Sequence, residues 1–253
     1  MRSFHIIMPM AGRGNRFLER GITVPKPLIC VEGIPIFKRA IDSLNDVCSD
    51  RKYSFIVRQE HIRDFSIDQC LRKFYPGAEV IAVEQTTRGA VETCLMAEEN
   101  IREDEAVAVM DCDLEFYSGS FNRNIVSDLS ENHPGVAGRL ISFDSDQPKY
   151  SYAQITKDGQ VIRTAEKQVI SDHALAGAYY FSRGEYFLSA AHELVRRFET
   201  GDVQAKELYI SLLYNILLET GNRIQLQKLD FYRSFGTPEE LTGMDWSWKS
   251  ANV

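Results

Sequence analysis

The sequence has no long hydrophobic run: nothing in it approaches the ~18 consecutive apolar residues that a membrane-spanning helix requires. The apolar stretch Phe4–Met8 is short, ends at Pro9 and is not followed by a cleavage site, so it indicates a strand rather than a signal peptide. The 8 prolines and 16 glycines follow no period, and 44 % of the residues are apolar, which excludes collagen-like order and disorder. These absences favour a cytoplasmic globular protein with no membrane partner.

Positive charge is in deficit. The chain has 29 Lys and Arg residues against 36 Asp and Glu residues, which gives a net charge of −7. Proteins that follow nucleic-acid backbones gain their affinity from an excess of Lys and Arg, so no nucleic-acid partner is expected. A small anionic ligand is compatible with this charge, because one local cationic site is enough to bind it.

Metal-binding patterns of cysteine and histidine are missing as well. The five histidines have no metal-ligand spacing and no two cysteines form C-x-x-C, so the sequence offers no structural zinc site. The number of cysteines is odd, which favours reduced thiols in the core of an intracellular protein. They are Cys30, Cys48, Cys70, Cys94 and Cys112.

The first half of the sequence alternates short apolar runs with helical patterns. The expected strands are residues 4–8, 53–57, 80–83 and 106–110, and the expected helices are residues 36–47, 62–74 and 89–101. Such strand-helix-strand units form a mostly parallel sheet with right-handed crossovers. The pattern predicts an α/β fold with a Rossmann-like mixed sheet flanked by helices.

The pattern changes after about residue 135. Strands are expected at 136–143, 150–156, 161–166 and 175–181, helices at 185–198 and 206–219, and a strand pair with a short helix from Pro238 at the end. Asp158-Gly159 is a hairpin turn signal, so this half contains antiparallel strands. No linker separates the halves. We therefore expect a single domain over residues 1–253, with the antiparallel portion beside or over a ligand.

A glycine-rich loop at residues 9–17 follows the first expected strand. Ligands of open α/β sheets bind at the carboxyl ends of strands, and Gly12 and Gly14 would let backbone N–H groups approach phosphate oxygens. The dinucleotide fingerprint and the Walker A pattern both fail here, since position 17 is Phe and no Gly-Lys-Ser/Thr follows. Arg13 and Arg16 suit a phosphate-binding loop instead. An ordinary strand-helix turn is the alternative.

A lysine between two prolines follows ten residues later. Pro25 and Pro27 fix their own φ angles, and Pro27 favours an extended backbone at Lys26. This arrangement would aim a single ammonium group at a ligand. A rigid surface turn with a solvated lysine is the alternative.

Taken together, the glycine-rich loop, Pro25-Lys26-Pro27-Leu28 and the segment 31–35 resemble the sugar-phosphate nucleotidyltransferases, also called nucleotide-sugar pyrophosphorylases. The resemblance continues, in the family's order, through Gln85–Ala90, Asp111–Asp113, Ala165–Lys167, Ala176–Phe181 and Phe235–Glu239. It implies a reaction in which an acceptor phosphate attacks the α-phosphorus of a nucleoside triphosphate and pyrophosphate leaves. It also implies a nucleotide-binding half at about 1–135 and an acceptor-binding half at about 136–253.

The resemblance assigns roles to individual residues. Arg16 and Lys26 would be catalytic, because transfer between two anions needs placed positive charge. The nucleotide would be bound by Met10, Ala11, Gly12, Arg13, Gly14, Gln85 and Gly89, and the acceptor by Glu166, Lys167 and Gly177. Three of these residues have a structural alternative to the expected role. Gln85 could only form hydrogen bonds with the backbone at the end of a strand, and Glu166 could only orient Lys167. Gly177 could only mark a kink in a strand.

Carboxylates at the end of the strand 106–110 would hold Mg²⁺, the implied cofactor. Asp113 is the first candidate and Asp111 the second, although either could cap the following turn. Many family members carry a second metal-binding Asp where this sequence has Ser234. The sequence also has Gly89-Ala90 where the usual pattern is Gly-Thr.

These departures weaken a thymidylyl assignment and favour CTP as the triphosphate. The acceptor would be a sugar phosphate or another small phosphorylated molecule used for capsule or surface-glycan precursors, and a homodimer is possible. Two alternatives remain open. Asp111-Cys112-Asp113 also fits a GT-A type glycosyltransferase with an Asp-x-Asp metal site, and Ser234 fits a non-catalytic ligand-binding member of the family.

Overall fold

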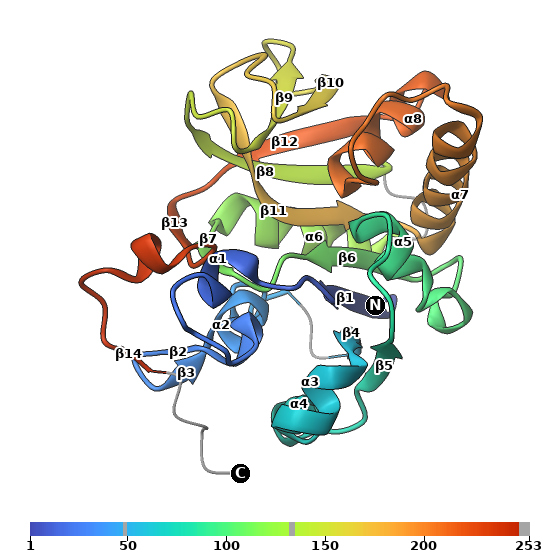
Figure 1. Cartoon of the computed structure of the whole chain (residues 1–253). Helices are drawn as coiled ribbons and strands as arrows, with labels where there is room; N and C mark the ends of the chain where they lie inside the picture. Colours follow the sequence, from blue (N-terminus) through green and yellow to red (C-terminus); the bar gives the residue numbers. More distant parts are fainter. Residues whose placement is uncertain (48–49, 132–134, 248–253) are drawn as a thin grey trace.

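The computed structural model describes residues 1–47, 50–131 and 135–247. Within them, nine strands form one sheet, whose main path runs β10-β9-β11-β6-β1-β4-β5, with β8 pairing with β11 and β12 (Figure 1). The strands from the first half are β1 (Phe4–Met10), β4 (Arg51–Arg58), β5 (Glu79–Val83) and β6 (Ala106–Met110). They are parallel to one another, with β1 between β4 and β6. The expected mixed, mostly parallel sheet of the α/β class is confirmed.

The second half extends the same sheet with antiparallel pairs. Its strands are β8 (Gly138–Asp144), β9 (Ser151–Ile155), β10 (Val161–Glu166), β11 (His173–Phe181) and β12 (Ile224–Lys228). β11 is antiparallel to β6, β8 and β9, while β12 is parallel to β8. β11 thereby joins the two halves, because it lies beside the last parallel strand of the first half.

Helices cover both faces of the sheet. The first-half helices are α1 (Asn15–Leu18), α2 (Ile36–Asp42), α3 (Gln59–Phe65), α4 (Ile67–Phe74), α5 (Ala90–Leu95) and α6 (Gly119–Ser130), and the later ones are α7 (Gly184–Thr200) and α8 (Leu213–Glu219). One buried cluster combines residues of α2, α4 and α6 with Ile6 and Met8 of β1, whereas the other combines α5, α7 and α8 with Ile7. This alternation along β1 places successive side chains on opposite faces of the sheet.

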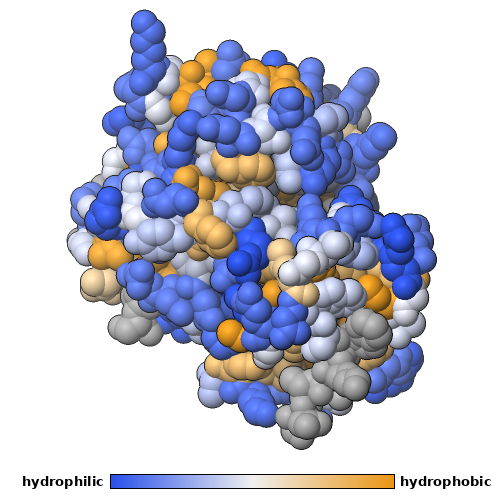
Figure 2. All heavy atoms as spheres, turned by 90° about the vertical axis from the view of Figure 1, so that its left-hand side faces the viewer, coloured by the Kyte–Doolittle hydropathy of each residue, from blue (hydrophilic) through white to orange (hydrophobic). Residues whose placement is uncertain are grey.

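The remaining elements are short turns and strands outside the large sheet. They are the 3-10 turns η1 (Lys26–Leu28), η2 (Glu98–Asn100), η3 (Ile210–Leu212) and η4 (Pro238–Leu241), and the strands β2 (Cys30–Val31), β3 (Ile34–Pro35), β7 (Leu114–Tyr117), β13 (Phe231–Ser234) and β14 (Trp246–Ser247). β7 pairs with β13, and β14 pairs with β2. On the side of the molecule turned to the viewer in Figure 2, hydrophobic residues lie in small groups among hydrophilic ones.

Several expected elements differ from the observed ones. The helix expected at 62–74 is broken at Ser66, which has a φ of +50° and separates α3 from α4. The helix expected at 206–219 is α-helical only in α8. The strands of the expected C-terminal pair do not pair with each other: β12 joins β8 and β13 joins β7. Helix α6 was not predicted at all.

The described cysteines agree with the expectation of reduced thiols. Cys30, Cys70, Cys94 and Cys112 are free and buried. Cys48 lies outside the described residues. The structure has no helix, in the part of the chain that it describes, that is long and apolar enough to cross a membrane.

Candidate active site

A cavity of about 270 Å³ opens where the two halves of the sheet meet. Its walls come from the segment between β6 and β7, from β9 and β11, from α1 and from the C-terminal segment around η4. The residues expected to carry the chemistry that line it are Arg16, Asp111, Asp113, Glu166 and Gly177. The cavity therefore brings together candidates from four separate parts of the sequence.

Lys26 and Asp113 form an ion pair at this cavity. The Lys26 Nζ atom donates a hydrogen bond of 2.6 Å to Asp113 Oδ2, and each side chain is about a quarter exposed, at 25 % and 22 %. Burial acts to raise the pKa of Asp113, but the Lys26 ammonium outweighs it and holds that pKa below its ordinary value. Burial acts to lower the pKa of Lys26, but the nearby Asp113 carboxylate stabilises the ammonium form, so the pKa of Lys26 is raised. Both groups are therefore charged near neutral pH.

Asp111 is the second carboxylate at this end of β6. Burial and the neighbouring Asp113 raise the pKa of Asp111 to about 7. The Asp111 N–H donates to the Gly177 carbonyl at 2.8 Å. Gly177 has a φ of +78°, and a Cβ atom there would lie 2.5 Å from Asp111 Oδ2, so the glycine is required by backbone conformation and by space.

The glycine-rich loop lies against the segment that follows β5. Arg13 Nε donates to Thr86 Oγ1 at 3.3 Å. The buried Arg58 guanidinium bridges the Ala11 carbonyl and the same Thr86 hydroxyl, at 3.4 Å each. Gly14 has a φ of +67° and precedes α1, which presents Arg16 to the cavity. Thus the expected phosphate-binding loop and the segment 85–90, which contains the nucleotide-binding candidates Gln85 and Gly89, are neighbours.

Other nucleotide-binding candidates take different places in this region. Met10 and Ala11 are buried, Gly12 and Gln85 are exposed, and Gly14 is half-buried. Gly89 has a φ of +144°, and a Cβ atom there would lie 2.5 Å from the Leu208 backbone nitrogen. Gly89 is therefore needed for close approach of the segment before α8, which is a structural reason for this glycine in addition to its expected role.

The two acceptor-side candidates at the end of β10 point in different directions. Glu166 lines the cavity and accepts hydrogen bonds from the hydroxyl groups of Ser151 and Ser211. Lys167 has a φ of +53° and donates to the Tyr209 hydroxyl at 2.8 Å, with its Nζ atom 4.7 Å from the centre of that ring. Lys167 is not among the residues that line the cavity.

Sequence reasoning missed three polar residues of the cavity. Lys149 and Glu240 line it and form an ion pair of 2.9 Å, and Ser151 supports Glu166. Lys149 follows Pro148 just before β9, and Glu240 lies in η4, two residues after Pro238. Glu240 directly follows the motif Phe235–Glu239, whereas Lys149 adjoins an expected strand and no motif, and the pairing of the two depends on segments 91 residues apart.

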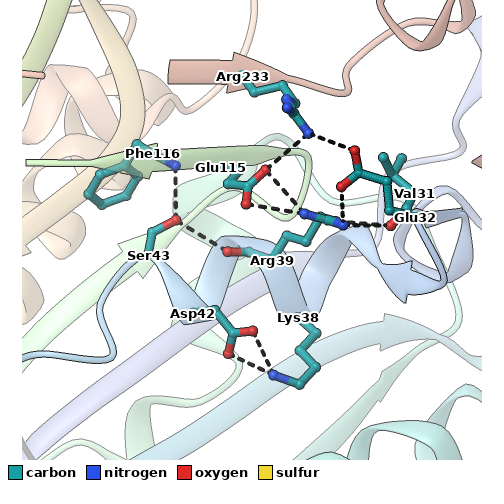
Figure 3. A network of polar contacts seen from close by, with 9 residues as sticks. All are labelled: Val31, Glu32, Lys38, Arg39, Asp42, Ser43, Glu115, Phe116 and Arg233. Carbon is teal, nitrogen blue, oxygen red and sulfur yellow. Dashed lines mark hydrogen bonds and ion pairs between the residues drawn. The ribbon is translucent and has the colours of Figure 1, made fainter. Parts of the chain in front are cut away.

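A network of charged side chains fixes the segments that follow Lys26 and Asp113 (Figure 3). Arg39 of α2 is buried and donates to the Val31 carbonyl at 2.8 Å, to Glu32 at 2.8 Å and to Glu115 at 3.2 Å. Arg233 of β13 reaches Glu32 at 3.7 Å and Glu115 at 3.6 Å. The network ties the β2–β3 hairpin to β7, so it holds the backbone on both sides of the Lys26–Asp113 pair.

The carboxylates fit the way proteins hold Mg²⁺. Among the described residues no group of three or more His, Cys, Asp or Glu side chains is arranged to hold a metal ion by itself. Mg²⁺ is commonly held by only one or two carboxylates together with substrate phosphates and water. Asp113 and Asp111, side by side at the cavity, match that donor set, whereas Ser234 supplies no charge.

The fold and the cavity define a class of protein: an α/β sheet that gathers lysine, arginine and carboxylate side chains at the carboxyl ends of its parallel strands, as phosphate-transferring proteins do. The chain belongs to the Nucleotidyl transferase family, whose model matches residues 5–231. It is a nucleotidyltransferase, and the resemblance to the sugar-phosphate nucleotidyltransferases is confirmed.

Solved structures agree with this assignment. A nucleoside-diphosphate-sugar pyrophosphorylase from Vibrio cholerae RC9 is 26 % identical, with a TM-score of 0.77 over 94 % of this chain and 98 % of that one. A Bacillus anthracis protein described as a glucose-1-phosphate thymidylyltransferase, in complex with sucrose, is 18 % identical, with a TM-score of 0.73 over 94 % and 92 %. The inositol-1-phosphate CTP transferase of T. maritima is 15 % identical, with a TM-score of 0.66 over 94 % and 91 %. The last two likenesses show the fold alone. A comparison with curated proteins finds no match.

Proposed function

We propose that the protein transfers a nucleoside monophosphate from a nucleoside triphosphate to a sugar phosphate or another small phosphorylated acceptor, with release of pyrophosphate. The observation that carries this proposal is the Lys26–Asp113 pair, whose Asp113 lines one cavity together with Asp111, Arg16 and Glu166. A cation and carboxylates together are what an in-line attack of one phosphate on another requires.

On the nucleotide side, Arg16 and the N–H groups of residues 10–14 would hold the triphosphate and stabilise the leaving pyrophosphate. Lys26 would leave Asp113 and neutralise charge on the α-phosphate as the acceptor approaches. Gln85 and Gly89 would face the base. No general base is needed, because the acceptor phosphate is already ionised near pH 7.

On the acceptor side, Glu166 would accept hydrogen bonds from hydroxyl groups of the acceptor. The Gly177 backbone would approach the same molecule closely, since no side chain lies in between. Lys167 would contribute only if its side chain turns away from Tyr209. In this proposal residues of about 1–135 bind the nucleotide and residues of about 136–253 bind the acceptor.

Mg²⁺ is the proposed cofactor. Bound with the nucleotide, it would neutralise phosphate charge during transfer. Asp113 would be its main protein ligand and Asp111 the second, while Ser234 leaves the site with one carboxylate fewer than the usual pattern. Protein affinity for Mg²⁺ should therefore be weak without nucleotide and much tighter with it.

CTP is the proposed triphosphate, on the grounds of Ser234 and of Gly89-Ala90, which depart from the thymidylyl pattern. The likeness in fold to an inositol-1-phosphate CTP transferase is compatible with this choice. The proposed setting is cytoplasmic synthesis of precursors for capsule or surface glycans, with a homodimer as the proposed assembly.

The test is a screen for pyrophosphate release with the four common triphosphates, each against a panel of phosphorylated acceptors. One pair should give acceptor-dependent release, and Lys26→Ala and Arg16→Ala should each lower turnover by roughly 10²-fold or more. Lys157→Ala is the matched control, because this exposed lysine lies in the turn between β9 and β10. Wild-type rates in both folded site variants would refute the mechanism. Transfer from a pre-made nucleotide-sugar, with no release of pyrophosphate from any triphosphate, would support a glycosyltransferase instead.

A further inference from the structure

The acceptor half places a lysine in the cavity that the family motifs do not predict. Lys149 lines the cavity, and its side chain is 44 % exposed. Its Nζ atom donates to Glu240 Oε1 at 2.9 Å and lies 4.8 Å from the centre of the Tyr150 ring. Lys167, the lysine expected to bind the acceptor, instead donates to Tyr209. Lys149 is thus the lysine of the second half that faces the cavity within the described residues.

Glu240 is fixed before any ligand arrives. Its Oε2 atom accepts the Ser234 hydroxyl at 2.7 Å and the Gly236 N–H at 2.8 Å, which leaves Oε1 for Lys149. Burial acts to raise the pKa of Glu240, but the hydrogen bonds from Ser234 and Lys149 outweigh it, so the net shift is downward. Glu240 is therefore ionised near neutral pH, and its two oxygens already have partners.

Ser234 is the residue that makes this arrangement possible. A hydroxyl group can donate to Glu240, whereas an Asp side chain at position 234 would bring a second carboxylate against Glu240 and oppose its ionisation. The serine that replaces the usual aspartate therefore has a positive role in this chain: it orients Glu240.

The pair lies next to the proposed reaction centre. A Cβ atom at Gly236 would be 3.1 Å from Asp113 Oδ2 and 3.4 Å from Glu240 Oε2, so both carboxylates lie close to this glycine. The cavity wall consequently includes the Lys149–Glu240 pair and Asp113, whose partner Lys26 lines a neighbouring pocket with the glycine-rich loop.

We propose that Lys149 binds the phosphate group of the acceptor, and that Ser234 and Glu240 position Lys149 for this contact. The proposal rests on the proposed function. An ammonium group has three donors, so Lys149 can keep its bond to Glu240 and still donate to phosphate oxygens. Glu240 is a positioning residue, since it acts through Lys149.

The first experiment measures steady-state kinetics with the acceptor found in the screen. Lys149→Met should raise the acceptor KM roughly tenfold or more, as expected for the loss of a charge-assisted hydrogen bond, while the triphosphate KM stays within about twofold. Lys149→Arg should restore part of the affinity. Glu240→Gln and Ser234→Ala should raise the same KM by a smaller factor, and Lys157→Met should leave both constants unchanged. An unchanged acceptor KM in folded Lys149→Met would overturn the proposal.

The second experiment needs no turnover. Lysine acetylation is followed by mass spectrometry in the wild-type protein with and without inorganic phosphate. Phosphate should slow the acetylation of Lys149 and leave that of Lys157 unchanged. Protection of Lys167 in place of Lys149 would overturn the proposal. If no triphosphate and acceptor release pyrophosphate but Lys149 is protected, the proposed function fails and this phosphate site stands.

Discussion

Gly177→Ala tests whether the cavity wall depends on the absence of a side chain. Two costs add at this position. An Ala residue at a φ of +78° costs roughly 1 kcal/mol, and its Cβ atom would lie 2.5 Å from Asp111 Oδ2 and 2.9 Å from Leu114 Cδ2. Forcing atoms into a packed site costs about 1–3 kcal/mol. The free energy of unfolding should therefore fall by about 2–4 kcal/mol.

Gly201→Ala is the matched control. Gly201 ends α7 with a φ of +79°, nearly equal to that of Gly177, but a Cβ atom there would meet nothing within 4 Å. In the control variant the free energy of unfolding should fall only by the cost of an Ala residue at a positive φ, roughly 1 kcal/mol. Thermal unfolding separates the two, since about 1 kcal/mol shifts the Tm by roughly 2–4 °C in a chain of this size.

Asp111→Ala identifies the contact responsible. In the Asp111→Ala background, Gly177→Ala should cost less than in the wild type, with a coupling of about 1–2 kcal/mol, because the carboxylate that the new methyl group would meet is gone. Two results would refute the reasoning: Gly177→Ala no more destabilising than Gly201→Ala, or equal costs in both backgrounds.

Three further predictions concern the metal, the charged network and pH. Asp113→Asn should abolish most activity and weaken Mg²⁺ binding in the presence of nucleotide, which isothermal titration measures; tight binding without nucleotide would contradict it. Arg39→Met should lower the free energy of unfolding in urea by about 2–4 kcal/mol, because it removes the Arg39 donors from the Val31 carbonyl and leaves Glu115 with only the longer contact to Arg233; a loss below about 1 kcal/mol would show that the network is dispensable. Burial lowers the pKa of His5 below 6.5 despite the hydrogen bond to Glu105, so its contribution to stability is present above about pH 6.5 and is lost as the pH falls; His5→Gln should flatten this slope between pH 7.5 and 5.5, and an unchanged slope would contradict the assignment.

Much of the fold could be predicted because each first-half strand contains a short, mostly apolar run. Ala106–Met110, for example, is buried on both faces and has the expected bounds. Helix α6 was missed although Phe121, Ile125 and Leu129 repeat every four residues and Ser118 caps its start. The break between α3 and α4 left no such signal, since Ser66 takes a left-handed conformation without a glycine.

The sequence by itself determined which residue types the site contains and where along the strands they stand. The glycine-rich loop follows β1, Lys26 lies between two prolines, and Asp111 and Asp113 follow β6, all from local patterns of apolar runs and turns. Only the tertiary structure decided which charges meet. Lys26 and Asp113 are 87 residues apart, and Lys149 and Glu240 are 91 residues apart. The physical reason is that an ion pair depends on distance in space, which the packing of the chain segments around the cavity sets and which no local pattern encodes.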